Sequence, residues 1–241
     1  MRRTIGSKTR FFAALILVLC LTAAAETAFA AAQHERIIQL STELIKKMEA
    51  QDDVDTMAQT VKSGIAVAVF PRLIKAGLGI GGMSGEGVVL VKNSKGGWNG
   101  PSFASLVGGS IGFQIGVSEI GLVLVITNEA GLQAFTGGKG FKLGGDVSVA
   151  AGPVGRDAGA ATDSRADASI YSYSMSKGLF AGVALSGSTI NVNGDANKAY
   201  WGKATEAKAA LGSPANSAKI KPLASELDKL MKLAGTAPKK K

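Results

Sequence analysis

Few side chains in this sequence could perform catalysis. His34 is the only histidine and Cys20 the only cysteine, and His34 lies close to the predicted mature N-terminus. The run from Gly77 to Gly82 fits the G-x-G-x-x-G pattern of dinucleotide sites, but the residues after it predict a strand instead of the required helix. Ser174 and Lys177 have the S-x-x-K spacing of acyl-enzymes, without the partner motifs S-D-N and K-T-G. The sequence therefore predicts no enzyme active site.

Metal and cofactor sites are not predicted either. A zinc site needs several Cys or His ligands, which this composition does not supply. Asp52, Asp53 and Asp55 are close enough to bind calcium, but they lack the Gly and the terminal Glu of an EF-hand loop. Capping of a following helix explains them better. We expect no catalytic residue, no bound metal and no cofactor.

Residues 1–30 predict a secretory signal peptide. The segment opens with a basic leader, formed by Arg2, Arg3, Lys8 and Arg10. An apolar run from Phe11 to Ala25 follows, and Ala28 to Ala30 supplies small residues for cleavage after Ala30. Leu19 before Cys20 argues against a lipoprotein signal. We therefore expect an exported protein of the periplasm or cell envelope.

Removal of the leader changes the charge of the chain. Loss of its four basic residues and one acidic residue lowers the formal net charge from +9 to +6. Such a surplus suits an anionic partner. Export argues against nucleic acid, and no basic stripe interleaved with aromatic residues is present to bind single strands.

Helical periodicity at both ends of the mature chain flanks a region of strand-like texture. Apolar residues from Gln33 to Ala50 recur at helical spacing, and a second helix is expected after Asp52 or Asp53. Further helices are predicted at Ala204 to Leu211 and at Pro222 to Leu233, where proline starts the helix. Between them, Val-rich and Ile-rich runs punctuated by glycine predict antiparallel strands. The candidate strands are Ile65 to Phe70, Gly77 to Ile80, Gly85 to Lys92, Ala104 to Val117, Ile120 to Thr127, Val147 to Ala151, Ile170 to Met175 and Val183 to Ile190.

These patterns predict a single α+β domain. We expect a curved, mainly antiparallel, glycine-rich sheet covered by N-terminal and C-terminal helices. The glycines are interpreted as structural, since they permit bulges or close approach of another backbone. The expected organisation is a signal peptide at 1–30, one domain at 31–234 and a disordered basic tail at 235–241.

The chain resembles the SYLF domain family from about Lys62 to Lys203. It departs from the family pattern at Asn99 and Gly100 and in the closing aromatic pair Tyr200 and Trp201. The matching blocks occur in the family's order and are Gly64 to Val67, Phe70 to Pro71, Lys75 to Gly77, Gly85 to Val88, Trp98 to Ser102, Gly112 to Gly116, Ala151 to Arg156, Tyr171 to Ser174, Lys177 to Gly182 and Asn197 to Gly202.

The resemblance implies a non-enzymatic, peripheral phospholipid-binding module. Eukaryotic members favour phosphoinositides and some bind actin, whereas bacterial members are typically exported single-domain proteins. Because a signal peptide is predicted here, we expect an anionic phospholipid membrane as the partner. Neither actin nor nucleic acid is expected.

Two sets of residues are candidates for lipid contact. The helix from Gln33 to Ala50 could lie in the membrane interface with its apolar face in the acyl boundary. The same face could instead pack on the sheet. Four basic residues inside the family blocks are candidates for head-group contact, although Arg156 could pair with Asp157. The predicted lipid-binding residues are Ile38, Ile45, Lys46, Lys47, Arg72, Lys75, Arg156 and Lys177.

Two other functional classes were weighed against lipid binding. A small outer-membrane β-barrel would show alternating segments of about 10 residues with aromatic girdles. Here aromatic residues make up only 6% of the chain. A hydrolase is disfavoured because no general base is evident. We expect binding in two parts, with basic side chains recruiting the protein and the helix from Gln33 to Ala50 then inserting.

Overall fold

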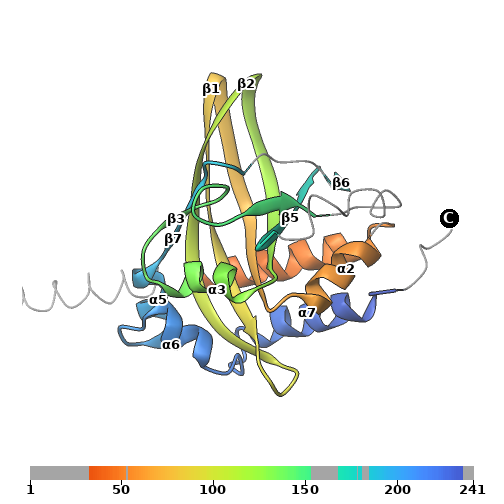
Figure 1. The fold of residues 1–241 in the computed structure, drawn as a ribbon, viewed down its shortest axis with the longest axis vertical. Coiled ribbons are helices and arrows are strands. Elements are labelled where there is room, and N and C mark those ends of the chain that lie inside the picture. The colour runs from red at the N-terminus through yellow and green to blue at the C-terminus, as the bar shows by residue number, and fades with distance from the viewer. Residues whose placement is uncertain (1–32, 53, 153–167, 178, 181–184, 236–241) are drawn as a thin grey trace, which may run out of the picture.

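The computed structural model of this protein describes residues 33–52, 54–152, 168–177, 179–180 and 185–235, with the backbone alone described at 78–80, 110–115 and 180. A seven-stranded sheet is flanked by helices (Figure 1). This arrangement confirms the predicted α+β fold. The predicted signal peptide and the tail from residue 236 lie outside the described residues.

The described elements follow one another along the chain. They are a helix at 33–49, α2 (Val54–Ser63), β1 (Ala66–Lys92), β2 (Trp98–Ile126), α3 (Glu129–Thr136), β3 (Phe141–Lys142), β4 (Val149–Ala151), β5 (Ile170–Ser176), β6 (Leu179–Phe180), β7 (Thr189–Val192), α5 (Gly194–Trp201), α6 (Ala207–Gly212) and α7 (Lys221–Lys232). We call the first of these the N-terminal helix.

Two very long strands, β1 and β2, form the centre of the fold. They pair antiparallel from Ala66 opposite Ile126 to Lys92 opposite Trp98, and residues 93–97 connect them. The sequence predicted five shorter strands across this span, between Ile65 and Thr127. In the structure the glycines lie within continuous strands, because a residue without a side chain can bend a strand without breaking its pairing.

The β1–β2 ribbon folds back on itself. A Cβ atom at Gly85 would collide with the carbonyl oxygen of Arg72, and one at Gly87 would lie 2.6 Å from the Phe70 ring. The two halves of β1 are therefore in direct contact, and the bend lies midway between them, near residues 78–79. The paired segment of β2 turns at the same level, since Leu78 pairs with Ile115. This bent end is at the top of Figure 1.

The five remaining strands extend the sheet from β2, either directly or through a neighbouring strand. β5 pairs with residues 121–126, and β7 pairs with residues 104–107. β3 extends the sheet beyond β7, while β4 pairs parallel with β5 and β6 pairs antiparallel with it. The described sheet is thus mainly antiparallel, as predicted.

Alternate residues of the central strands enter two separate cores, one on each face of the sheet. The N-terminal helix, α2 and α7 cover one face, where Val67, Val69, Val123 and Val125 are buried. α3, β3 and α6 contribute Phe135, Phe141 and Leu211 to the other core, which contains Ala66, Ala68, Leu122 and Leu124. Both faces of this half of the ribbon are therefore covered.

Polar contacts tie the helices to the same half of the ribbon. Lys92 donates from Nζ to the carbonyl oxygens of Val61 (2.5 Å) and Lys62 (2.7 Å) at the end of α2. A cation at a helix C-terminus satisfies carbonyl groups that lack intrahelical partners. Trp98 donates from Nε1 to Asp228 Oδ1 in α7 at 2.8 Å. We call this part of the ribbon, where β1 and β2 begin and end, the covered end.

Candidate functional site

The apolar residues predicted to enter a membrane from the N-terminal helix are buried in the protein core. Ile38 is 2% exposed and Ile45 is fully buried. Leu44 of the same helix lies against Gly121 of β2, where a Cβ atom would overlap its side chain. Of the two readings of this helix, the structure shows the one in which its apolar face packs on the sheet. Lys46 and Lys47 are exposed on its opposite side.

Three of the predicted basic residues lie at neighbouring levels of the sheet. Lys75 pairs in register with Ser118, and Arg72 forms an ion pair with Glu119 (Nε to Oε2, 2.6 Å) in which both side chains are about half exposed. Lys177 is exposed in the turn after β5 and has φ 51°. It follows Met175, the partner of Gly121, by two residues and so lies near the level of Glu119.

The remaining basic candidates do not join this group. Lys46 and Lys47 belong to the N-terminal helix, and Arg156 lies outside the described residues. The structure therefore brings together Lys75, Lys177 and the Arg72–Glu119 pair.

Exposed aliphatic side chains accompany these charges. Val117 is 75% exposed and belongs to the segment of the ribbon between Glu119 and the bend. Ile74 shares its face, because Val117 pairs with Ala76 and alternate residues of a strand point the same way. The exposed large hydrophobic residues of the described chain are Ile74, Val107, Val117 and Leu179.

The bent end of the ribbon has no charged residue in its sequence. Residues 76–85 of β1 and 107–118 of β2 contain no Asp, Glu, Lys or Arg. The sequence reasoning attributed these stretches to structural glycines alone. The length of these charge-free runs was the signal that could have predicted an uncharged surface here.

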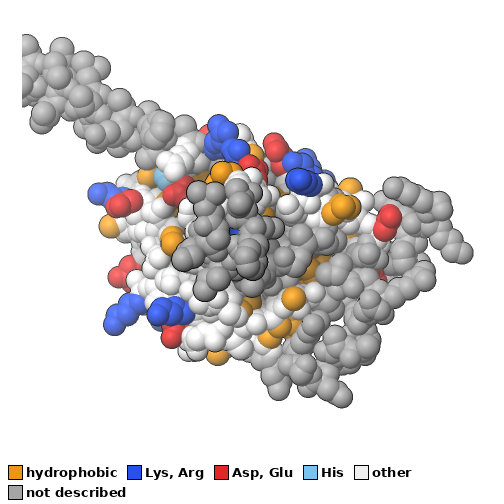
Figure 2. Space-filling view, turned by 90° about the horizontal axis from the view of Figure 1, so that it is seen from above, with side chains coloured by type: hydrophobic (Ala, Val, Ile, Leu, Met, Phe, Trp, Pro, Cys, Tyr) orange, Lys and Arg blue, Asp and Glu red, His pale blue; other side chains and the backbone are white. Residues whose placement is uncertain are grey.

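Figure 2 looks onto the bent end of the molecule. On this face, Lys and Arg side chains lie toward the rim together with Asp and Glu side chains, and orange hydrophobic side chains are interspersed with uncharged white atoms. The candidate site is therefore an uncharged, partly aliphatic surface, and the nearest charged residues along its strands are Lys75, Glu86 and Glu119. We call it the ribbon end and define it as residues 76–85 and 107–118, with Lys75 and Lys177 at its base.

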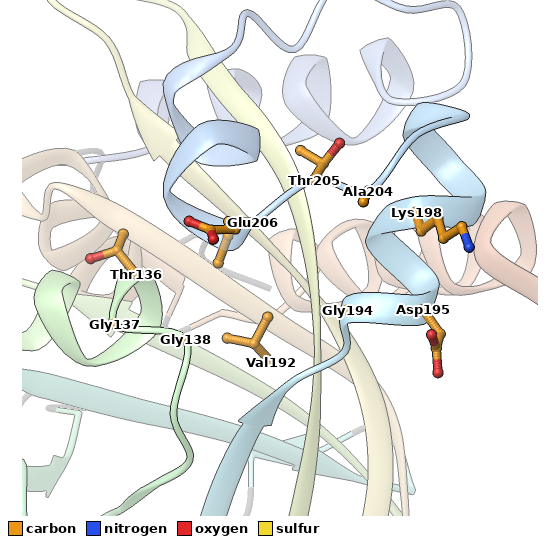
Figure 3. A pocket seen from close by; sticks show the side chains of 11 residues that line it. Thr136, Gly137, Gly138, Val192, Gly194, Asp195, Lys198, Ala204, Thr205 and Glu206 are labelled. Atoms are coloured by element: carbon orange, nitrogen blue, oxygen red, sulfur yellow. The ribbon is translucent and has the colours of Figure 1, made fainter.

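A hollow of about 600 Å³ lies elsewhere, between the end of α3, the start of α5 and residues 204–207 (Figure 3). Asp195, Lys198 and Glu206 are its charged lining residues. Two acidic groups against one basic group do not favour an anionic head group. This hollow therefore fits the predicted ligand less well than the ribbon end does.

Two titratable groups at the covered end are withdrawn from water, Glu49 partly and His34 almost completely. Burial raises the pKa of Glu49 to about 7, with a further contribution from the nearby carboxylate of Glu226. Its Oε1 atom has no hydrogen-bond partner within the described part of the chain. His34, expected near a mobile chain end, is buried against the Phe103 ring with 5.0 Å between ring centroids. Burial lowers the pKa of His34, and neither group lies at the ribbon end.

The described ranges contain neither a cluster of metal ligands nor a long apolar helix. No group of three His, Cys, Asp or Glu side chains there is arranged to hold a metal ion. No described helix has the length and apolar character needed to cross a bilayer.

The C-terminal half of the chain matches a known protein family. A family model described as "Ysc84: Las17-binding protein actin regulator" matches residues 107–230, about half of the chain. This match confirms the resemblance to SYLF-type domains. The chain belongs to the Ysc84 family.

Curated relatives agree with this assignment. The chain is 36% identical over 140 residues to SH3 domain-containing YSC84-like protein 1 of Xenopus laevis, covering 58% of this chain and 41% of that protein. It is 36% identical over 138 residues to LAS seventeen-binding protein 3 of Saccharomyces cerevisiae, covering 56% and 30%. It is also 34% identical over 177 residues to SH3 domain-containing protein PJ696.02 of Schizosaccharomyces pombe, covering 72% and 40%. The chain thus spans less than half of the length of each relative.

The comparisons correct one expectation about partners. Actin was not expected as a partner, because residues 1–30 predict a signal peptide. The matching family is described as an actin regulator, and its members include proteins named for binding Las17. The exclusion of actin was therefore wrong, because it relied on a leader that lies outside the described residues.

Proposed function

We propose that this protein is a non-enzymatic, peripheral phospholipid-binding protein that acts at an anionic membrane surface. The observation that supports this most directly is the ribbon end, where exposed aliphatic side chains and an uncharged sequence adjoin Lys75 and Lys177. An element with an uncharged sequence at its tip and lysines at its base suits the boundary between acyl chains and anionic head groups.

Electrostatic attraction supplies the recruiting part of this interaction. Each Lys or Arg near an anionic membrane contributes about 1 kcal/mol, and this contribution falls off within a Debye length. Lys75 and Lys177 lie at neighbouring levels of the sheet, and in this proposal both contribute to the attraction. Arg72 contributes less, because Glu119 already neutralises it at 2.6 Å.

The N-terminal helix is not the element that we propose for apolar contact with the membrane. The N-terminal helix uses Ile38 and Ile45 in the core, so its insertion would require it to leave the sheet. Lys46 and Lys47 remain available for electrostatic contact without such a rearrangement. The lipid-binding role of these four residues stays a prediction.

Vesicle co-sedimentation tests the proposed function. We expect strong binding to phosphatidylglycerol or cardiolipin vesicles, weak binding to phosphatidylcholine, and a steep loss of binding as salt is raised. A Lys75→Glu, Lys177→Glu double variant should bind at least about 10-fold more weakly, since two attractive contacts become repulsive. The matched control is Lys208→Glu, Lys232→Glu, which reverses two exposed lysines on α6 and α7. Equal binding to neutral and anionic vesicles at all salt concentrations would contradict the proposal.

The cellular location is part of the same proposal. The basic leader, the apolar run and the small residues up to Ala30 support export to the periplasm or cell envelope. The intact mass of the protein purified from the cell envelope tests this location. We expect a chain that begins at Ala31, and a mass that includes Met1 would contradict cleavage.

A second candidate function is contact with proteins that regulate actin. The description of the matching family and the names of its yeast members favour it. Co-sedimentation with actin filaments, in the absence of lipid, tests this function separately. Binding that saturates would support it, and recovery of the protein only in the supernatant would contradict direct filament binding.

A further inference from the structure

We propose that the ribbon end is the part of the protein that enters the bilayer, and that it enters only the interfacial layer. This inference rests on the proposed lipid binding and adds the inserting element, its orientation and its depth. In this proposal the exposed surface of the ribbon end contacts an anionic membrane. Its chemistry follows from the adjoining cations and from the absence of charge across the segments that reach the bend.

The orientation follows from the placement of charge along the ribbon. Going from the bend toward the covered end, the first charged residues on this half of the ribbon are Lys75 in β1 and Glu119 in β2. Glu119 is paired with Arg72, so Lys75 and the neighbouring Lys177 are the cations without a described ion-pair partner at this level. A membrane that meets these lysines at its head groups must receive the bend first.

The length of the charge-free segment sets the reach of the ribbon end. Three to four residues separate Lys75 from the bend near residues 78–79, which corresponds to about 10–13 Å at about 3.3 Å per residue. Interfacial elements lie about 5–10 Å into the boundary between head groups and acyl chains. Half of a hydrocarbon core is about 15 Å thick. The ribbon end can therefore reach into one leaflet without crossing it.

Unpaired backbone groups limit the depth further. β1 pairs only with β2 in the described sheet, and the strands that add to β2 cover only residues 104–107 and 121–126. Among the described residues, 76–85 of β1 and 108–118 of β2 therefore present N–H and C=O groups on their outer edges without a neighbouring strand. Such groups are costly in hydrocarbon but find partners among head groups and water. The open edges thus favour shallow insertion.

Site-specific fluorescence tests this placement in the full chain. Cys20→Ser removes the only cysteine, after which Val117→Cys and Gly82→Cys, in separate proteins, place one environment-sensitive label on each strand. Both positions are exposed, and a Cβ at Gly82 has no atom closer than 3.9 Å. Ala209→Cys on α6 is the control label, since it is exposed at the covered end.

With phosphatidylglycerol vesicles we expect a several-fold rise in fluorescence at positions 117 and 82 and no change at 209. Nitroxide lipids labelled near the head group should quench more than lipids labelled near the chain end. Val117→Asp should weaken vesicle binding about 10-fold, whereas Ala209→Asp should leave it unchanged. These results together would support shallow insertion of the ribbon end.

Contrary outcomes separate the inference from the proposed function. Vesicle binding without a fluorescence change at positions 117 and 82 would overturn the inference and leave lipid binding intact. Stronger quenching from the chain end would overturn the shallow depth. A concentration-dependent change without vesicles would show that a second copy covers the surface, and would overturn membrane insertion. Absence of any vesicle binding by the unsubstituted chain would overturn the proposed function itself.

Discussion

The two ends of the β1–β2 ribbon differ in what covers them, although the same two strands build both. At the covered end, helices pack on one face and α3, β3 and α6 on the other, so valine side chains such as Val67 and Val123 are buried. At the ribbon end, Val117 of β2 is 75% exposed. Valine side chains of the same strands are therefore part of the core at one end and exposed on the surface at the other.

This difference separates structural causes from functional ones. An uncharged sequence is required at the covered end, because burying an unpaired charge is expensive. An exposed strand has no such requirement, and exposed edges commonly carry charged residues that prevent association. Packing constrains some of residues 76–85 and 107–118, since Met83 is buried and a Cβ atom at Gly85 would collide with a backbone oxygen. At exposed positions such as Gly82 and Val117, the absence of charge has no such explanation in stability. It points to contact with an apolar environment.

Ile45→Asp should cause the largest effect, by breaking the covered end. Ile45 is fully buried among helix and sheet residues, so an aspartate there would be an unpaired buried charge. We expect a loss of more than about 4 kcal/mol of unfolding free energy or complete unfolding, measured by circular dichroism and urea denaturation. Val117→Asp is the matched control and should change stability by less than about 0.5 kcal/mol. A folded Ile45→Asp protein of normal stability would contradict the packing of this helix.

Gly85→Ala tests the fold-back that joins the two ends. The new methyl group would collide with the carbonyl oxygen of Arg72 and approach the Leu73 side chain to 2.8 Å. Because overpacking against backbone cannot be relieved by a rotamer change, we expect a loss of about 1–3 kcal/mol in urea denaturation.

Gly82→Ala is the control for this fold-back, since the nearest atom to its Cβ would be 3.9 Å away. It should leave the unfolding free energy within about 0.5 kcal/mol of the unsubstituted protein. Equal destabilisation by the two substitutions would show that close contact between the halves of β1 is not what Gly85 permits.

Glu49→Gln should have a smaller, pH-dependent effect at the covered end. Burial raises the pKa of Glu49 from 4.5 to about 7. Between these values the folded protein holds a proton that the unfolded chain has released, so stability falls as pH rises from about 4.5 to 7. Glutamine removes this dependence, and at pH 8 it should stabilise the protein by about 1 kcal/mol, a value reduced because the side chain is partly exposed.

Melting curves at several pH values measure this effect. The melting temperature of the unsubstituted protein should decline across the interval more than that of Glu49→Gln. Parallel curves for the two proteins would contradict the raised pKa. Glu43→Gln is the control, because Glu43 is exposed on the same helix and should leave the curve unchanged.

The helices with long apolar periodicity were predicted well from the sequence. The predicted helix at Gln33 to Ala50 occupies 33–49, and the one at Pro222 to Leu233 occupies Lys221–Lys232. Two short helices, α3 and α5, were missed. Both begin at an asparagine whose side chain accepts from a backbone N–H, Asn128 from Gly131 and Asn193 from Ala196. These N-caps were the available signal, but eight-residue helices offer too little periodicity to outweigh the surrounding strand pattern.

The candidate site was predicted only in part, because its character depends on exposure. The sequence identified Lys75 and Lys177 through a family resemblance, and the structure places both at the base of the ribbon end. It could not decide whether Ile38 and Ile45 face a membrane or a sheet, since both require the same amphipathic pattern. Exposure of Val117 follows from which strands pair beside β2. That pairing is a long-range property that local composition does not determine.

The matched bends of β1 and β2 also restrict how this domain can change during evolution. Because side chains alternate along a strand, one extra residue on one side of the bend would send every residue beyond it to the opposite face. Insertions or deletions tolerated near residues 78–79 should therefore come in even numbers and be balanced by changes around residues 111–115 of the paired strand. Length differences among relatives in these two segments should be correlated, so that the ribbon is inherited as one unit that lengthens or shortens in paired steps.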